Sequence, residues 1–225
     1  MVNRPTRLDP LAERILERLS GRPEAGEIVL GGYFALQHYA AYRETHDIDA
    51  WWRIRPTTGT EEVVRSVMNE VAREGGFELR ERRFGETLSW ELHREGKKRF
   101  SFQIAVRSVE LEPPVPSAWP PVLLETLRDN LGAKMNALVE RGAPRDFTDI
   151  MQVVTCGHAT IGDCWVLWVR KNPGASEEAA KRKLLFHLCG LELRRPLAHI
   201  ADADERARAE RTRLWFRAEF LGGRA

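Results

Sequence analysis

A proline-rich stretch, LEPPVPSAWPP at residues 111–121, separates two parts of the chain that have different sequence patterns. It holds five of the twelve prolines. Because proline has a fixed φ and no amide hydrogen, this stretch cannot form a regular helix or a central strand. The sequence therefore predicts a boundary here, with one domain over residues 1–112 and a second over residues 113–225.

The first part predicts a sheet with helices. Residues 8–19 and 60–74 carry apolar side chains at helical spacing, and residues 33–41 predict a third, short helix. Asp9 and Pro10 predict the start of the helix at 8–19, and Gly75 and Gly76 predict the end of the helix at 60–74. Short stretches that are apolar or alternate in polarity predict about five strands. These stretches cover residues 26–32, 46–52, 77–83, 87–93 and 99–106.

The second part predicts helices alone. Apolar residues recur at helical spacing in stretches at 122–141, 145–155, 163–170, 177–189 and 205–220. The expected fold class is therefore α+β. An α/β-like mixed sheet would form the first domain, and an all-helical C-terminal domain would follow it.

Composition limits the classes of protein to which the chain can belong. No run approaches the roughly 18 apolar residues of a membrane span, and the first residues lack the apolar core of a secretory signal. We therefore expect a cytoplasmic protein with no membrane partner, whose three cysteines are free thiols. The formal net charge of +2 is too small to identify a nucleic-acid binder. Basic clusters such as REGKKR at residues 94–99 still offer local contacts to RNA.

Two glycines and two aspartates flank the predicted short helix. Asp47 and Asp49 are two residues apart on a predicted strand, so their side chains project from the same face. Neighbouring carboxylates repel each other, and these hard oxygen ligands favour Mg²⁺. Gly31 and Gly32 predict a turn whose backbone amides can receive a phosphate. A helix over residues 33–41 spans about 13 Å. The five residues up to Asp47 can cover about 16 Å when extended, so the chain can bring the aspartates back to the level of the glycines.

These residues carry a resemblance to a known family. GGYFALQHYAAYRETHDID, residues 31–49, resembles the first motif of the polymerase-β-like nucleotidyltransferase superfamily, in which a Gly-Gly or Gly-Ser pair precedes Asp-x-Asp. More narrowly, the chain is similar to the AbiEii/AbiGii-type nucleotidyltransferase toxins of abortive-infection toxin–antitoxin systems. The second half of the family pattern is also present. The segment LGAKMNALVERGAPRDFTDI, residues 131–150, is similar to the family's Lys-x₃-Leu-x₂-Arg segment followed by Arg-Asp-x-x-Asp.

The resemblance implies a Mg²⁺-dependent enzyme that transfers a nucleoside monophosphate from an NTP to an acceptor such as the 3′ end of tRNA. It also implies an antitoxin as a partner. Asp47 and Asp49 would hold the metal, and Lys134 would neutralise phosphate charge in the transition state. Asp146 or Asp149 would orient the Lys–Arg face or act as a base. The nucleotide-binding residues would be Gly31, Gly32, Arg43, Thr45, Lys134, Arg141 and Arg145, although Arg43 and Arg145 fit structural ion pairs equally well.

One position departs from the superfamily pattern. Many polymerase-β-like enzymes carry a third carboxylate on a later strand, where the alternation in RFSFQIAV places Gln103. An amide cannot supply negative charge to a second metal, and Glu91 is only a distant substitute. Three functions therefore stay open: nucleotide transfer to RNA, transfer to a small molecule or a protein hydroxyl, and binding of nucleotide or RNA without turnover.

Overall fold

A computed structural model describes residues 4–107 and 109–222 of the protein. Contacts between Cα atoms divide the chain into two compact units, Met1–Asn130 and Leu131–Ala225. The sequence places the boundary after residue 112 instead. The difference arises because residues 113–130 supply two short strands to the sheet of the first unit and the first turn of a helix.

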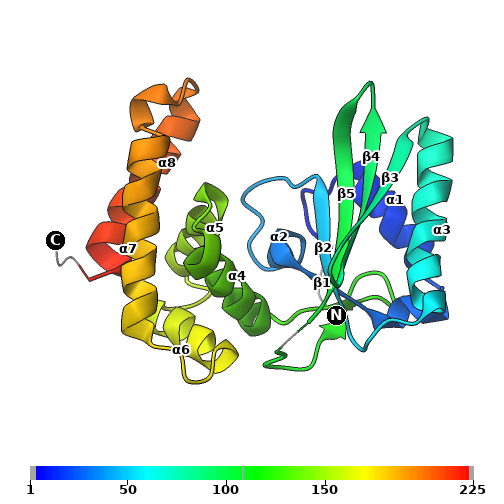
Figure 1. Cartoon of the computed structure of the whole chain (residues 1–225), viewed down its shortest axis with the longest axis horizontal. Helices are drawn as coiled ribbons and strands as arrows, with labels where there is room; N and C mark the ends of the chain where they lie inside the picture. The colour runs from blue at the N-terminus through cyan, green and yellow to red at the C-terminus, as the bar shows by residue number, and fades with distance from the viewer. Residues whose placement is uncertain (1–3, 108, 223–225) are drawn as a thin grey trace. The chain divides into compact units, whose positions relative to one another are not determined.

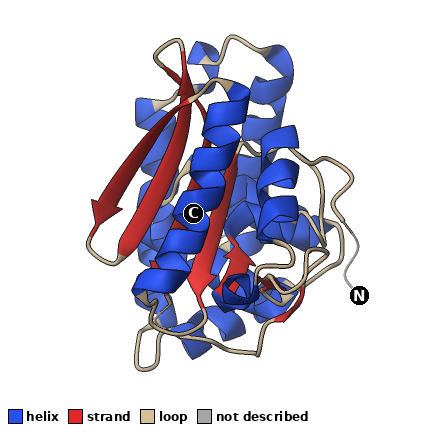
Figure 2. Ribbon diagram, turned by 90° about the vertical axis from the view of Figure 1, so that its right-hand side faces the viewer, coloured by secondary structure: helices blue, strands red, loops and turns tan. Residues whose placement is uncertain are grey.

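The first unit is built on a seven-stranded mixed sheet in the order β3-β4-β5-β2-β1-β7-β6. Its strands, red in Figure 2, are β1 (Ile28–Gly31), β2 (Asp47–Trp52), β3 (Glu78–Phe84), β4 (Thr87–Arg94), β5 (Lys97–Val106), β6 (Val115–Pro116) and β7 (Leu123–Leu124). β5 runs parallel to β2 and β7 runs parallel to β1, whereas the other neighbours are antiparallel.

The mixed sheet confirms the predicted fold class, but it has two more strands than the five expected. β6 and β7 have two residues each, which is too short for any alternation to be visible in the sequence. β6 lies at the edge of the sheet and contains Pro116. An edge is the place in a sheet where a proline is tolerated, because one side of the strand has no ladder partner.

Two helices cover one face of this sheet (Figure 1). α1 (Pro10–Leu19) begins as predicted at Asp9, whose carboxylate accepts from the Leu11 amide. α3 (Thr58–Gly75) ends as predicted at Gly76, which has a φ of 65°. The buried side chains of both helices and of one face of the strands form a single hydrophobic core. The opposite face of the strands is the polar one, and it carries the candidate site.

The helix after the glycines is shorter than predicted. α2 spans Gly32–Leu36 and is followed by turns, so the expected helix over residues 33–41 is wrong in length. The cause is a set of hydrogen bonds between a side chain of α2 and the loop that follows it. The hydroxyl of Tyr33 accepts hydrogen bonds from the amides of Tyr42 and Arg43 and donates to the Arg43 carbonyl. These bonds draw the chain back as a compact loop.

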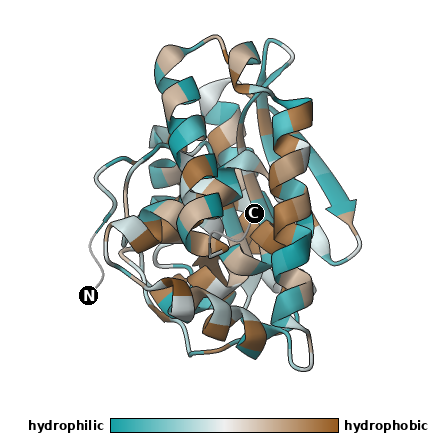
Figure 3. Ribbon diagram, turned by 90° about the vertical axis from the view of Figure 1, so that its left-hand side faces the viewer, coloured by the Kyte–Doolittle hydropathy of each residue, from teal (hydrophilic) through white to brown (hydrophobic). Residues whose placement is uncertain are grey.

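The second unit is helical, as predicted. Its helices are α4 (Leu127–Arg141), which begins within the first unit, α5 (Pro144–Thr155), α6 (Ile161–Lys171), α7 (Glu177–Arg194) and α8 (Ala203–Trp215). Figure 3 shows hydrophobic segments along the helices that face the viewer. Within residues 4–107 and 109–222, no helix combines the length and the apolar character that crossing a membrane requires.

Candidate active site

Asp47 and Asp49 project from the same face of β2, as the sequence predicts. Residues along β2 alternate between half-buried and buried, and the two aspartates belong to the half-buried set. Ile48 and Ala50, between and after them, are buried in the core on the other face. The two carboxylates therefore share the polar face of the sheet, at the N-terminal end of a central strand.

The Gly31–Gly32 turn lies directly against this pair. Gly31 is opposite Asp49 in the antiparallel ladder between β1 and β2. A Cβ on Gly32 would lie 2.2 Å from Asp49 Oδ2, and one on Gly31 would lie 2.3 Å from Trp51 Nε1. The glycines are thus required for close packing of side chains from β2, a reason beyond the turn and the phosphate contact that the sequence predicts.

Replacing Gly32 by alanine is expected to destabilise the fold by more than the strain of its backbone alone. Gly32 has a φ of 58°, which costs a non-glycine residue about 1–3 kcal/mol, and the added Cβ would also collide with Asp49. Gly76→Ala is the matched control, because Gly76 has a φ of 65° and nothing within 4 Å of its Cβ position. Urea unfolding should show a larger loss for Gly32→Ala. Equal losses would contradict the contact with Asp49.

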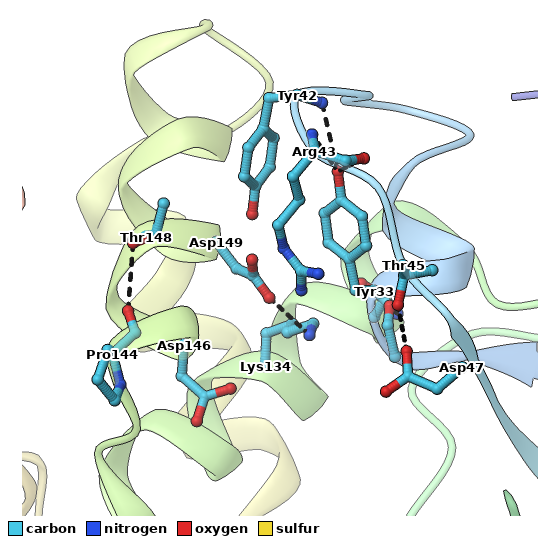
Figure 4. Close-up of polar contacts among 12 residues, drawn as sticks. Tyr33, Tyr42, Arg43, Thr45, Asp47, Lys134, Pro144, Asp146, Thr148 and Asp149 are labelled. Atoms are coloured by element: carbon cyan, nitrogen blue, oxygen red, sulfur yellow. Dashed lines mark hydrogen bonds and ion pairs between the residues drawn. The ribbon is translucent and has the colours of Figure 1, made fainter. Parts of the chain in front are cut away.

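Thr45 and Arg43 lie just before the aspartates in the chain. The hydroxyl of Thr45, which is buried, donates a short hydrogen bond to Asp47 Oδ1 (Figure 4). The guanidinium carbon of Arg43 lies 3.5 Å from the centre of the Tyr33 ring. Thr45 therefore orients one of the two carboxylates, and Tyr33, which the sequence did not indicate as functional, holds the arginine.

Gln103 occupies the predicted place of a third carboxylate. β5 pairs with β2 so that Gln103 is opposite Asp49 and Ser101 is opposite Asp47. Among the residues that the structure describes, no three acidic, histidine or cysteine side chains gather in a group fit to hold a metal ion. Across β2 and β5, the carboxylates on this face are therefore those of Asp47 and Asp49, and the Gln103 amide lies opposite Asp49.

Glu91 lies one strand further away on the same face. In the ladder between β4 and β5 it is opposite Ser101, so Asp47, Ser101 and Glu91 form a row across three strands. His93 Nε2 lies 3.0 Å from Glu91 Oε2. This hydrogen bond, together with the nearby positive charges of Arg82 and Lys98, lowers the pKa of Glu91 below its ordinary value. Glu91 is therefore an ionised group that is already engaged locally.

Within the second unit, the matched motif forms two ion pairs between α4 and α5. Lys134 Nζ lies 2.7 Å from Asp149 Oδ2 (Figure 4). Arg141 contacts both oxygens of Asp146, at 2.7 and 2.8 Å. Lys134 is 7% exposed and both aspartates are fully buried, so Lys134 is not an ordinary surface lysine. This geometry favours the aspartates as groups that orient Lys134 and Arg141.

Arg145, the remaining predicted residue, is exposed. No ion pair joins it to another residue in the described part of the chain. Two roles were predicted for Arg145, a phosphate contact and a structural ion pair, and the structural ion pair is not observed among the described residues.

A buried polar network behind the glycine turn was not predicted. Asn130 Nδ2 donates to the Gly32 carbonyl at 2.9 Å and to Glu125 Oε2 at 2.7 Å. Arg107 Nη2 contacts Glu125 Oε1 at 2.7 Å and also forms a close ion pair with Asp129. Charged residues are normally exposed, and only the spacing of Glu125 and Asp129, four apart, hints at a common partner. The network fixes the carbonyl of the turn.

Comparisons with known proteins extend this picture. A search of curated proteins found none that matches the chain. A family model described as "Nucleotidyl transferase AbiEii toxin, Type IV TA system" matches residues 14–219, and so includes both units. The family implies a nucleotide substrate and an antitoxin as counterpart. The chain therefore belongs to the AbiEii family of nucleotidyl transferase toxins of type IV toxin–antitoxin systems.

Proposed function

We propose that this protein transfers a nucleoside monophosphate from an NTP to the 3′ end of an RNA, with tRNA as the acceptor. In this reaction the acceptor hydroxyl oxygen bonds to the α-phosphorus, the bond from the α-phosphorus to the bridging oxygen breaks and releases pyrophosphate, and the hydroxyl proton passes to the solvent. The observation that carries the proposal is the pair Asp47 and Asp49 on one face of β2, packed against the Gly31–Gly32 turn.

Mg²⁺ is the proposed cofactor, and the two aspartates fit it. They offer hard carboxylate oxygens on one face, and Mg²⁺ is commonly held by one or two carboxylates together with substrate phosphates. The ion, when bound, would offset phosphate charge and orient the NTP. Thr45 would hold Asp47 in the rotamer that faces the metal. The amide at Gln103 favours a site with less negative charge than one with three carboxylates.

Lys134 is the proposed cation for the phosphates. It belongs to the Lys-x₃-Leu-x₂-Arg segment on which the resemblance to the family rests. Asp149 would keep the ammonium group oriented. Arg141, held by Asp146, would add positive charge. Arg145, exposed near the start of α5, is proposed as a further phosphate contact.

The acceptor is proposed to be RNA because a basic cluster lies near the aspartates. Lys97, Lys98 and Arg99 are exposed at the start of β5. β5 is parallel to β2, and Ser101 on it is opposite Asp47. Lys98 is three residues before Ser101, which corresponds to about 10 Å along the strand. Contacts from such lysines and arginines to phosphates provide most of the sequence-independent affinity for a nucleic acid.

Replacing Lys97, Lys98 and Arg99 together by glutamine should weaken RNA modification but leave NTP binding nearly unchanged. Loss of three phosphate contacts should reduce the slope of log K against log salt by about 2–3. The matched control is Arg53, Arg55 and Arg73 to glutamine, since these exposed arginines lie outside the cluster and the change of charge is the same. RNA affinity would be measured from 50 to 300 mM KCl. Equal slopes in both triple variants would count against an RNA contact by this cluster.

The acceptor itself can be identified by label transfer. The protein would be incubated with Mg²⁺, total RNA and each α-labelled NTP in turn, and we expect the label at the 3′ end of tRNA. Label on a small molecule or on protein would overturn the RNA acceptor but leave nucleotidyl transfer intact. No transfer from any NTP, with nucleotide still bound, would favour a protein that binds without turnover, the alternative that Gln103 supports.

A further inference from the structure

A hollow in the second unit is lined by residues outside the candidate site. Its volume is about 290 Å³. It lies where the end of α7, the short helical turn η2 (Leu197–His199) and the second half of α8 come together, and it extends to the turn η3 (Phe216–Phe220). Its wall combines charged and apolar side chains, so the chemistry of the wall restricts what the hollow can bind.

Arg213 is a buried cation in this wall. Its side chain is 8% exposed, and Nη2 donates to the Arg195 carbonyl at 2.7 Å. Burial lowers the pKa of Arg213, Glu192 opposes this shift, and the positive charges of Arg195 and Arg217 add to it. No carboxylate forms an ion pair with Arg213 within residues 4–107 and 109–222. Since a guanidinium has five N–H donors and arginines are rarely so buried unless paired, Arg213 has donors to offer to an anion.

The other charged side chains of the hollow do not neutralise Arg213. Glu192 is engaged with Arg217, whose Nη2 lies 2.5 Å from Glu192 Oε2. Glu210 is exposed and precedes Arg213 by three residues on α8. It forms no ion pair with any residue in the described part of the chain. The hollow therefore presents one cation, Arg213, and one carboxylate, Glu210, for interaction with a ligand.

Apolar side chains form the rest of the wall. Leu214 is 59% exposed although it is large and apolar, and Pro196 and Leu197 are partly buried. Ligand sites typically combine an apolar wall with a few polar groups that fix the orientation of the ligand. A ligand with matching chemistry has a negative charge for Arg213 and an apolar group for Leu197 and Leu214.

We propose that this hollow binds a carboxylate with an apolar group on the neighbouring carbon atom, the chemistry of a peptide's C-terminal residue and of a free apolar amino acid. The carboxylate accepts two parallel hydrogen bonds from Arg213, and the apolar group packs against Leu197 and Leu214. Glu210 separates the two sources, because a free amino acid carries an ammonium group that this carboxylate attracts, whereas a peptide has a neutral amide there. The inference does not depend on the proposed nucleotide transfer.

The test is an NMR titration of the full chain with N-acetyl-L-leucine, L-leucine and N-acetyl-L-leucinamide. The leucinamide keeps the apolar group but has no negative charge, so N-acetyl-L-leucine should bind at least about 10-fold more tightly. In Arg213→Gln this ratio of Kd values should fall to about 1, because the charge-assisted hydrogen bonds are lost. Equal Kd values for the acid and the amide with the wild-type protein, or no binding of either at about 20 mM, would overturn the proposal.

A second variant tests the apolar wall and leaves the buried arginine in place. Leu214→Asp removes the apolar group and adds a negative charge at an exposed position, so the protein should stay folded while the Kd for N-acetyl-L-leucine rises about 10-fold. Leu185→Asp is the matched control, because Leu185 is also an exposed helical leucine, at 43%, and lies outside the hollow. Its Kd should not change, and equal losses in the two variants would count against the hollow as the binding site.

The comparison of L-leucine with N-acetyl-L-leucine identifies the source of the carboxylate. Binding of N-acetyl-L-leucine at least as tight as that of L-leucine identifies a peptide C-terminus. Tighter binding of L-leucine that Glu210→Gln abolishes identifies a free amino acid. An advantage of L-leucine that persists in Glu210→Gln would contradict the role given to Glu210.

Discussion

Asp49→Asn should abolish nucleotide transfer in a protein that remains folded. The substitution removes one negative charge from the proposed Mg²⁺ site but almost no volume, so the side chain can still pack against Gly32. Loss of a group that stabilises charge in the transition state costs about 10²–10³-fold in kcat. We expect transfer of label from the NTP to fall by at least this factor at saturating Mg²⁺, with the thermal unfolding midpoint little changed.

Asp202→Asn is a suitable control for this experiment. Asp202 is the N-cap of α8 and accepts from the Glu205 amide, and asparagine is an equally good N-cap. The change therefore also replaces a carboxylate by an amide at a structural position, and activity should be retained. If Asp49→Asn kept full activity at ordinary Mg²⁺ concentrations, Asp47 and Asp49 would not form the metal site.

Lys134→Met should have two separable effects, one on stability and one on catalysis. Asp149 is fully buried and lies 2.7 Å from the Lys134 ammonium group. Removing one member of a buried ion pair destabilises a protein by about 3–5 kcal/mol. If Lys134 also neutralises phosphate charge in the transition state, kcat should fall by about 10²-fold or more. Urea unfolding and single-turnover transfer would measure the two effects.

The double variant Lys134→Met/Asp149→Leu distinguishes these effects. Replacing both members of a buried ion pair by apolar residues is often neutral or stabilising, so the double variant should recover most of the lost stability. It should recover none of the transfer activity. Recovery of both would show that Lys134 is structural and would remove it from the proposed catalytic residues.

The sequence predicted the strands and helices that have a clear period or a clear end. The alternation in β5 correctly placed Gln103 beside Asp49, as the ladder shows, because one face of a sheet accepts only every second residue. Asp9 and Gly76 correctly marked a helix start and a helix end, because their roles depend on local backbone geometry.

What the sequence did not predict depends on contacts between distant residues. α2 ends at Leu36 because the loop after it is held by Tyr33, and no local signal marks that end. Arg107 meets Glu125 and Asp129 only through the folded chain. The two candidate motifs were found because the spacing of the residues within each is short. The way that Asp149 and Asp146 divide between Lys134 and Arg141 could be read only from the packed helices.

The two ion pairs between α4 and α5 have a consequence for how this hairpin can vary. Arg141 and Asp146 meet close to the turn, whereas Lys134 and Asp149 meet further along the two helices. Sliding α5 by one turn, about 5.4 Å, would separate both pairs and leave two buried carboxylates without these cations. The two ion pairs therefore specify how α5 is aligned along α4. Replacing Lys134 or Arg141 alone would leave a buried carboxylate without this cation, so each pair links one position on α4 to one position on α5.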